Sequence, residues 1–205
     1  MRSPRKGGGS AAVSAAPTTT PESIRGGKPR LNAGRPRSGS WFRFVPPPKE
    51  ADTDGVPGTQ EPGDAFGASV AAGDVNGDGL ADVAVGAPDE AIGTTTRAGA
   101  ATVLYGGPGG VTGTGAQQFG QASAGVPGSA EQNDLFGSQV SLADLNGDGK
   151  GDLTVGSSGE NGSEGSLHML NGTASGVTVN GVRAFSSGTL GVSGRYARIG
   201  EVVLG

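Results

Sequence analysis

The sequence repeats itself after 70 residues, and this repeat limits the possible folds more than any other feature. Residues 64–86 align without a gap with residues 134–156. A further match, 99–106 with 165–172, has an offset of 66, so a few residues are lost in the loop between. Two matched copies of one unit indicate a repeat architecture, in which neighbouring units bury a common core.

Each copy is typical of four short strands separated by turns. Alternating apolar residues and short β-branched runs, interrupted by Gly-rich turns, predict strands in both copies. Gly makes up 42 of the 205 residues and aromatics only 4%, which favours short strands with many turns over a helical core. The predicted strands are 66–72, 82–86, 100–105 and 116–119, then 136–142, 153–155, 166–170 and 182–185.

Four antiparallel strands in about 65–70 residues are the size of a large β-propeller blade. We therefore predict an all-β chain that forms a partial β-propeller, with two four-stranded antiparallel blades plus the first strand of a third. Blade 1 is expected at about 64–125, blade 2 at about 134–190 and the start of blade 3 from 196, where Ile199 takes the place of Phe66 and Phe136. Closing a ring takes at least about four blades. We expect the remaining blades to be missing from a fragment or supplied by a further chain.

Residues 1–58 differ from the rest in charge and composition. Residues 1–50 hold ten Lys/Arg and two Asp/Glu, a balance of +8, whereas residues 51–205 hold five and seventeen, a balance of −12. Residues 1–50 also contain eight of the thirteen prolines. We predict a disordered, basic, Pro/Gly-rich leader over 1–58, because such a segment buries too little apolar surface to offset its ordering entropy. The sequence contains no apolar run of about 18 residues, so it predicts no transmembrane helix.

Each copy also carries an acidic loop of the pattern Asp-x-Asn-x-Asp-Gly-x-x-Asp between its first two strands. Alternate side chains of a curled loop can converge on one point, and Ca²⁺ takes about six to eight oxygen ligands. A solvated hairpin turn is the alternative, but two copies in one register favour metal binding. An EF-hand is excluded because its twelfth position needs a bidentate Glu and is Val85 or Val155 here.

We therefore predict about two Ca²⁺ sites, each with four side-chain ligands and one backbone carbonyl at the seventh position. The predicted ligands are Asp74, Asn76, Asp78, Leu80 and Asp82 in the first loop, and Asp144, Asn146, Asp148, Lys150 and Asp152 in the second.

Together, the Phe-Gly pair at 66–67, the acidic loop and Val-Gly-Ala-Pro at 85–88 resemble the FG-GAP repeat of integrin α-subunit head domains and their bacterial relatives. The resemblance covers about residues 64–205. It implies a propeller, usually seven-bladed, with calcium in the hairpin loop between the first two strands of a blade. The second copy departs from the pattern, with Gly-Ser-Ser at 156–158. Because the family is mostly extracellular or surface-attached, the implied location is secreted or at the cell surface.

The resulting hypothesis is a calcium-binding extracellular module that binds a protein or glycan ligand or mediates adhesion, with a structural metal. The alternative is the non-catalytic propeller portion of a secreted hydrolase. We predict that the chain is not an enzyme, because it lacks the nucleophile-elbow and phosphate-loop motifs and its single histidine, His168, occupies an alternating strand position. Nucleic-acid binding through the basic leader is a third possibility, and the acidic body argues against a nucleic-acid partner.

Overall fold

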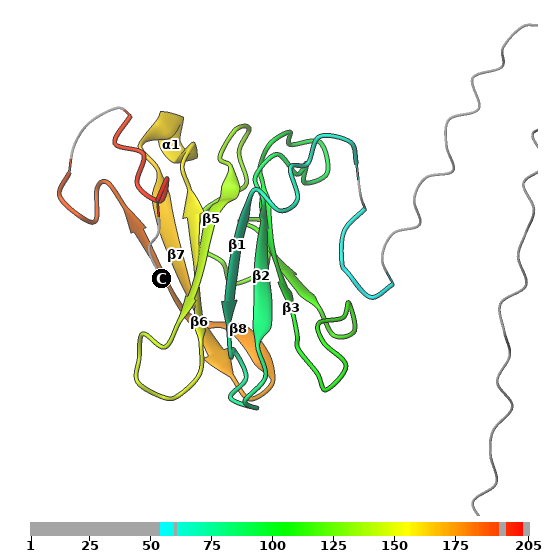
Figure 1. The fold of residues 1–205 in the computed structure, drawn as a ribbon. Helices are drawn as coiled ribbons and strands as arrows, with labels where there is room; N and C mark the ends of the chain where they lie inside the picture. Colours follow the sequence, from blue (N-terminus) through cyan, green and yellow to red (C-terminus); the bar gives the residue numbers. More distant parts are fainter. Residues whose placement is uncertain (1–53, 60, 193–195, 203–205) are drawn as a thin grey trace, which may run out of the picture. The chain divides into compact units, whose positions relative to one another are not determined.

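A computed structural model describes residues 54–59, 61–192 and 196–202, and within them the chain forms two four-stranded antiparallel sheets (Figure 1). In each sheet the strands follow one another in sequence order. The first sheet contains β1 (Ser69–Gly73), β2 (Asp82–Ala87), β3 (Ala100–Leu104) and β4 (Gln117–Phe119). The second contains β5 (Phe136–Ala143), β6 (Asp152–Ser157), β7 (Ser166–Thr173) and β8 (Gly176–Ser186).

The all-β fold with two four-stranded blades is confirmed, and every predicted strand has a counterpart. The first strand was predicted to begin at residue 66 and begins instead at Ser69. The equivalent strand β5 begins at Phe136, which pairs with Ser157 and bridges to Gly99 of the preceding blade, whereas the pairing of β1 with β2 starts only at Ser69. The last strand is longer than predicted. β8 begins at Gly176 because a tight hairpin pairs that residue with Thr173 at the end of β7.

Two predictions extend beyond the described residues. The leader predicted over 1–58 lies outside them except for 54–58, and the third-blade strand predicted from 196 is described only as far as Val202. The one helix in this part of the chain is α1 (Glu160–Ser163), a single turn between β6 and β7. No described helix has the length and apolarity that crossing a membrane would require.

The two sheets share one hydrophobic core. Ala84, Val103 and Phe119 from the first sheet pack in the same cluster as Phe136 and Leu153 from the second. β5 is the strand of the second sheet that lies against β1, β2 and β3. Fully burying a valine, leucine or phenylalanine side chain contributes roughly 1.5–3 kcal/mol. The packing of one blade on the other is therefore a main source of stability.

The junction between the blades is built from backbone as well as side chains. Gly99 and Phe136 form a parallel bridge, and the Phe136 N–H donates to the Ala98 carbonyl over 3.0 Å. The Gly137 carbonyl lies so close to Gly86 that a Cβ atom there would sit 2.0 Å from the oxygen. The Phe-Gly pair of the second repeat therefore packs directly against Gly86 and Gly99 of the first repeat, where a side chain would not fit.

The same junction recurs where blade 2 meets residues 196–202. Gly165 and Ile199 form a parallel bridge, and the Ile199 N–H donates to the Glu164 carbonyl over 2.9 Å. A Cβ atom on Gly156 would lie 2.0 Å from the Gly200 carbonyl oxygen. Ile199 thus takes the structural place of Phe136, as the alignment predicted.

Candidate metal centres

The two acidic loops connect β1 to β2 and β5 to β6, and Figure 1 shows both at the lower end of the sheets. They lie next to each other. The Gly151 N–H donates to the Asp74 carbonyl over 2.7 Å, and a Cβ atom on Gly77 would contact the Lys150 side chain at 3.3 Å. The packing of the blades therefore brings the two candidate centres side by side.

The first aspartate organises each loop by accepting backbone hydrogen bonds. In the first loop, Asp74 Oδ1 accepts from the N–H groups of Gly77 (2.7 Å) and Asp78 (3.2 Å), and Oδ2 accepts from Gly79 (2.8 Å). Asp144 makes the equivalent three bonds, at 2.7, 3.1 and 2.9 Å. Gly77 and Gly79 have φ values of 75° and 84°, which a side chain would disfavour in this curl.

These N–H donors also set the charge of the first aspartate. The hydrogen bond from Gly79 lowers the pKa of Asp74 most, and the bond from Gly149 does the same for the pKa of Asp144. Hydrogen bonding to the charged form favours ionisation. Each loop therefore holds an ionised carboxylate at neutral pH.

The third and fifth positions repeat the same local pattern. In the first loop, Asn76 Oδ1 accepts from the Asp78 N–H (2.9 Å) and Asp78 Oδ1 accepts from the Leu80 N–H (2.8 Å). In the second loop, the corresponding bonds to Asn146 and Asp148 measure 2.8 and 3.0 Å. Since each bond spans two residues, the loops are shaped by their own sequence.

The ninth position has a role that the motif alone does not reveal. Asp82 is fully buried, with Oδ2 accepting from the Val75 N–H (2.8 Å) and Oδ1 accepting from the Gly106 N–H (2.7 Å). Asp152 binds the N–H groups of Leu145 and Gly172, both at 3.0 Å. This aspartate joins the loop to the end of the third strand of its blade. The aligned glycines at 106 and 172 were the only sequence signal for it.

A positive charge distinguishes the second loop from the first. Lys150 Nζ lies 3.7 Å from Asp148 Oδ2 and donates to the Asp148 carbonyl over 3.4 Å. Leucine occupies this position in the first loop. A cation at the second loop would therefore compete with the lysine ammonium for Asp148.

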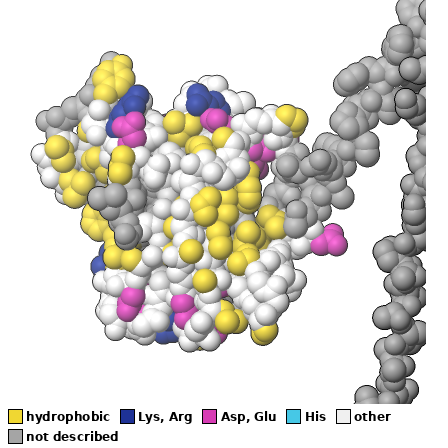
Figure 2. Space-filling view, in the orientation of Figure 1, with side chains coloured by type: hydrophobic (Ala, Val, Ile, Leu, Met, Phe, Trp, Pro, Cys, Tyr) yellow, Lys and Arg dark blue, Asp and Glu magenta, His cyan; other side chains and the backbone are white. Residues whose placement is uncertain are grey.

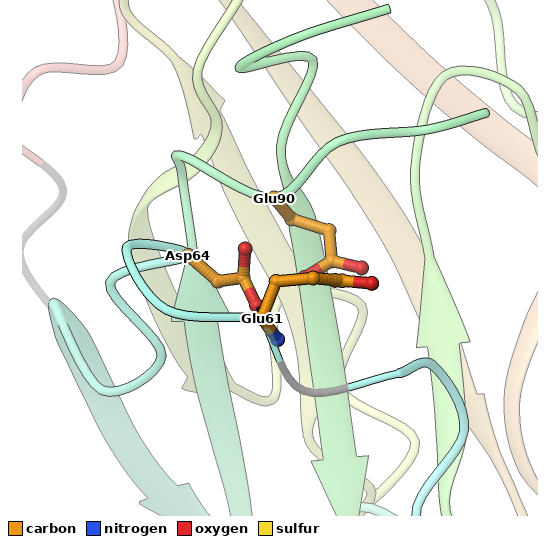
Figure 3. Close-up of side chains that lie close together, drawn as sticks. All are labelled: Glu61, Asp64 and Glu90. Carbon is orange, nitrogen blue, oxygen red and sulfur yellow. Dashed lines mark hydrogen bonds between the residues drawn. The ribbon is translucent and has the colours of Figure 1, made fainter. Parts of the chain in front are cut away.

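The donor set of each loop fits a hard cation, since it consists of three carboxylates, one amide oxygen and a backbone carbonyl. The three carboxylates of a loop are nevertheless not drawn together. Among the described residues, the acidic groups with ligand atoms all within 4.8 Å of one another are Glu61, Asp64 and Glu90 (Figure 3), which lie outside both loops. Sequence reasoning missed this cluster, although its three residues recur 70 positions later as Glu131, Asp134 and Glu160.

His168 lies in the shared core rather than in an open site. It is 2% exposed, its ring packs on Phe136 with centroids 5.2 Å apart, and Nε2 lies 3.0 Å from the Pro127 carbonyl oxygen. Because a carbonyl can only accept, Nε2 carries the proton and Nδ1 is left without a partner among the described residues. Its surroundings are those of a packing residue.

Two comparisons with known proteins agree with the motif analysis. The FG-GAP repeat family matches residues 66–104 and 136–170, which include both acidic loops. Integrin alpha-4 of Xenopus laevis is 34% identical over 122 residues, a region that covers 59% of this chain. The same region covers 11% of the frog protein, so the chain matches only a small part of that relative.

Proposed function

Because two segments of this chain match the FG-GAP repeat and pack as neighbouring blades, we propose that it is a calcium-stabilised, extracellular binding or adhesion module. Its ligand on this proposal is a protein or a glycan, and the metal is structural. The similarity to an integrin α-subunit supports the extracellular location and the binding role. The single histidine, His168, is buried in the core, which argues against its use as a catalytic base.

The observation that carries the calcium proposal is the shared hydrogen-bonding pattern of the two loops. The first, third and fifth positions accept the same backbone hydrogen bonds in both loops. The lowered pKa values of Asp74 and Asp144 keep an ionised oxygen in each. The proposed ligands are Asp74, Asn76, Asp78, the Leu80 carbonyl and Asp82, and Asp144, Asn146, Asp148, the Lys150 carbonyl and Asp152. A bound cation would offset the repulsion that arises when the carboxylates of a loop converge on one point.

Thermal unfolding of the full chain in Ca²⁺ and in chelator tests this proposal. We expect Ca²⁺ to raise the melting temperature, because a ligand at 100 times its Kd stabilises the folded state by about 2.7 kcal/mol per site. Replacing Asp74 or Asp144 by alanine should remove part of that increase. Asp54→Asn, at an exposed position outside both loops, is the matched control. Equal melting temperatures with and without Ca²⁺ would refute the proposal.

The binding role can be tested separately with an array of immobilised extracellular-matrix proteins and glycans. We expect at least one ligand to be retained in Ca²⁺ and released by chelator, because disordering the loops alters the end of the blades that carries them. Hydrolysis of generic ester or phosphate substrates by the purified chain would contradict the non-catalytic assignment.

A further inference from the structure

Glu61, Asp64 and Glu90 form a compact acidic cluster at the start of blade 1. Glu61 and Asp64 precede β1, and Glu90 follows β2; Figure 3 shows the three side chains turned toward one another. The backbone holds them there. The Glu61 N–H donates to Asp64 Oδ2 (2.7 Å), and the Glu90 carbonyl accepts from the Gly99 N–H (3.0 Å). The cluster is therefore part of the fold and not a chance meeting of surface side chains.

Glu90 is buried without a partner for its charge. It is 8% exposed, no cation approaches its carboxylate among the described residues, and the hydrogen bond it shares with the Asp64 side chain favours the protonated form. Burial first, and then the charges of Asp64 and Glu61, raise the pKa of Glu90 to about 7. A buried carboxylate in this position needs a counter-charge or a proton.

The second repeat shows how the same cluster is satisfied when a donor is present. Glu131 donates its N–H to Asp134 Oδ2 (2.6 Å), as Glu61 does to Asp64. Here, however, the amide Nε2 of Gln121 donates to Glu160, the counterpart of Glu90, and that bond opposes the effect of burial on the pKa of Glu160. Gln121 follows β4 of the preceding blade and is 5% exposed. No equivalent amide reaches Glu90 within the described residues.

We propose that Glu61, Asp64 and Glu90 bind a divalent cation of the hard, oxygen-seeking class, at a site distinct from both acidic loops. The geometry permits it, because oxygens within 4.8 Å of one another can all lie at about 2.3–2.6 Å from a single Ca²⁺ ion. Glu61 is exposed and gives the ion a route from solvent. The cation takes the place that the Gln121 amide occupies beside Glu160, and water completes its coordination.

Counting the Ca²⁺ ions bound to the full chain by equilibrium dialysis and calorimetric titration tests the site. We expect one equivalent more than the loops bind, and Glu90→Gln should lose that one equivalent. Glu160→Gln is the matched control and should lose none, because a neutral amide already satisfies that position. If the loops bind nothing, the unmodified chain should bind one ion and the Glu90 variant none, so failure of the loop proposal is distinguishable from failure of this one.

A second variant keeps the test decisive if Glu90→Gln does not fold. Glu61→Gln changes an exposed side chain and should leave the fold intact while weakening the additional site at least tenfold. The proposal is overturned if Glu90→Gln binds as many ions as the unmodified chain, which would mean that a proton alone satisfies Glu90. It is equally overturned if Glu61→Gln leaves every Ca²⁺ affinity unchanged.

Discussion

Single aspartates in the two loops serve different physical purposes despite their common chemistry. Asp82 is buried and accepts hydrogen bonds from Val75 and Gly106, so it holds backbone segments together whether or not a cation is present. Asp78 is exposed, and it accepts from the N–H two residues ahead. An asparagine at Asp78 can keep that bond, whereas at Asp82 its NH₂ group would face a backbone N–H.

This difference predicts how the two asparagine variants behave without calcium. Asp82→Asn should lower the free energy of unfolding by roughly 1–3 kcal/mol in chelator, the cost of an unsatisfied buried polar group. Asp78→Asn should lower it by less than about 0.5 kcal/mol, as expected for an exposed position, and should lose stabilisation only when Ca²⁺ is added. Urea unfolding measures both, and equal losses in chelator would contradict the structural role of Asp82.

The burial of His168 leads us to predict that the stability of the protein depends on pH. Burial lowers the pKa of its imidazole from the ordinary 6.5, so the unfolded chain binds the proton more readily than the folded one. The stability that the neutral ring contributes is complete above pH 6.5 and is lost as the pH falls through the lowered pKa. We expect His168→Gln to lose less stability between pH 7 and pH 5 than the unmodified chain. Parallel pH profiles from urea unfolding would count against this.

Among the structural elements, the Phe-Gly pair and the glycines after β2 form one interlocking unit. Gly137 (φ 87°) and Gly67 (φ 94°) hold equivalent places in the two repeats. A Cβ atom on Gly137 would lie 2.2 Å from the Ala100 carbonyl oxygen, whereas one on Gly67 would meet nothing within 4 Å. The two positions therefore share a positive φ, which a side chain would strain, and differ in the contact with a neighbouring blade.

The glycine pair gives a test of this interlock. Gly67→Ala should lower the free energy of unfolding by about 1–2 kcal/mol, the cost of a left-handed residue with a side chain. Gly137→Ala should lower it by a further 1–3 kcal/mol or so, because the added methyl group overpacks the junction. Chemical denaturation of both variants in the same buffer checks the difference, and equal losses would show that the junction can relax.

For the whole molecule, the difference between the two blades lies in what covers them. Phe136 and Val140 are 0% and 5% exposed because blade 1 packs on them, whereas their counterparts Phe66 and Val70 are 54% and 61% exposed. Figure 2 shows apolar side chains gathered over the first sheet in this view. The junction between the two blades therefore contributes to stability through buried side chains, whereas the outer face of blade 1 does not.

A pair of alanine variants measures this asymmetry. Phe136→Ala should lower the free energy of unfolding by about 3–5 kcal/mol, as is usual when a buried phenylalanine is truncated. Phe66→Ala should lower it by less than about 1 kcal/mol, because a half-exposed side chain gives up little packing. Thermal and urea unfolding report both values. A large loss for Phe66→Ala would mean that a further contact covers that face in solution.

Much of the architecture is readable from the sequence because it depends on short-range interactions. The strands follow from local alternation, and the loop hydrogen bonds of Asp74 and Asp78 span only two to five residues. The repeat then gives the register of the two copies and the place of Ile199, since equivalent residues make equivalent bridges. The prediction that was wrong concerned the start of the first strand, because the pairing of Phe136 with Ser157 and Gly99 has no counterpart at the start of β1 among the described residues.

The sequence by itself therefore determined the repeat, the all-β fold and the two candidate calcium loops. Only the tertiary structure decided that Asp82 reaches Gly106, 24 residues away, and that Glu61, Asp64 and Glu90 meet in one cluster. It also decided that Gln121 satisfies Glu160 while Glu90 has no such donor. Contacts between distant segments depend on how one blade packs on the next, and no local pattern of residues encodes that placement.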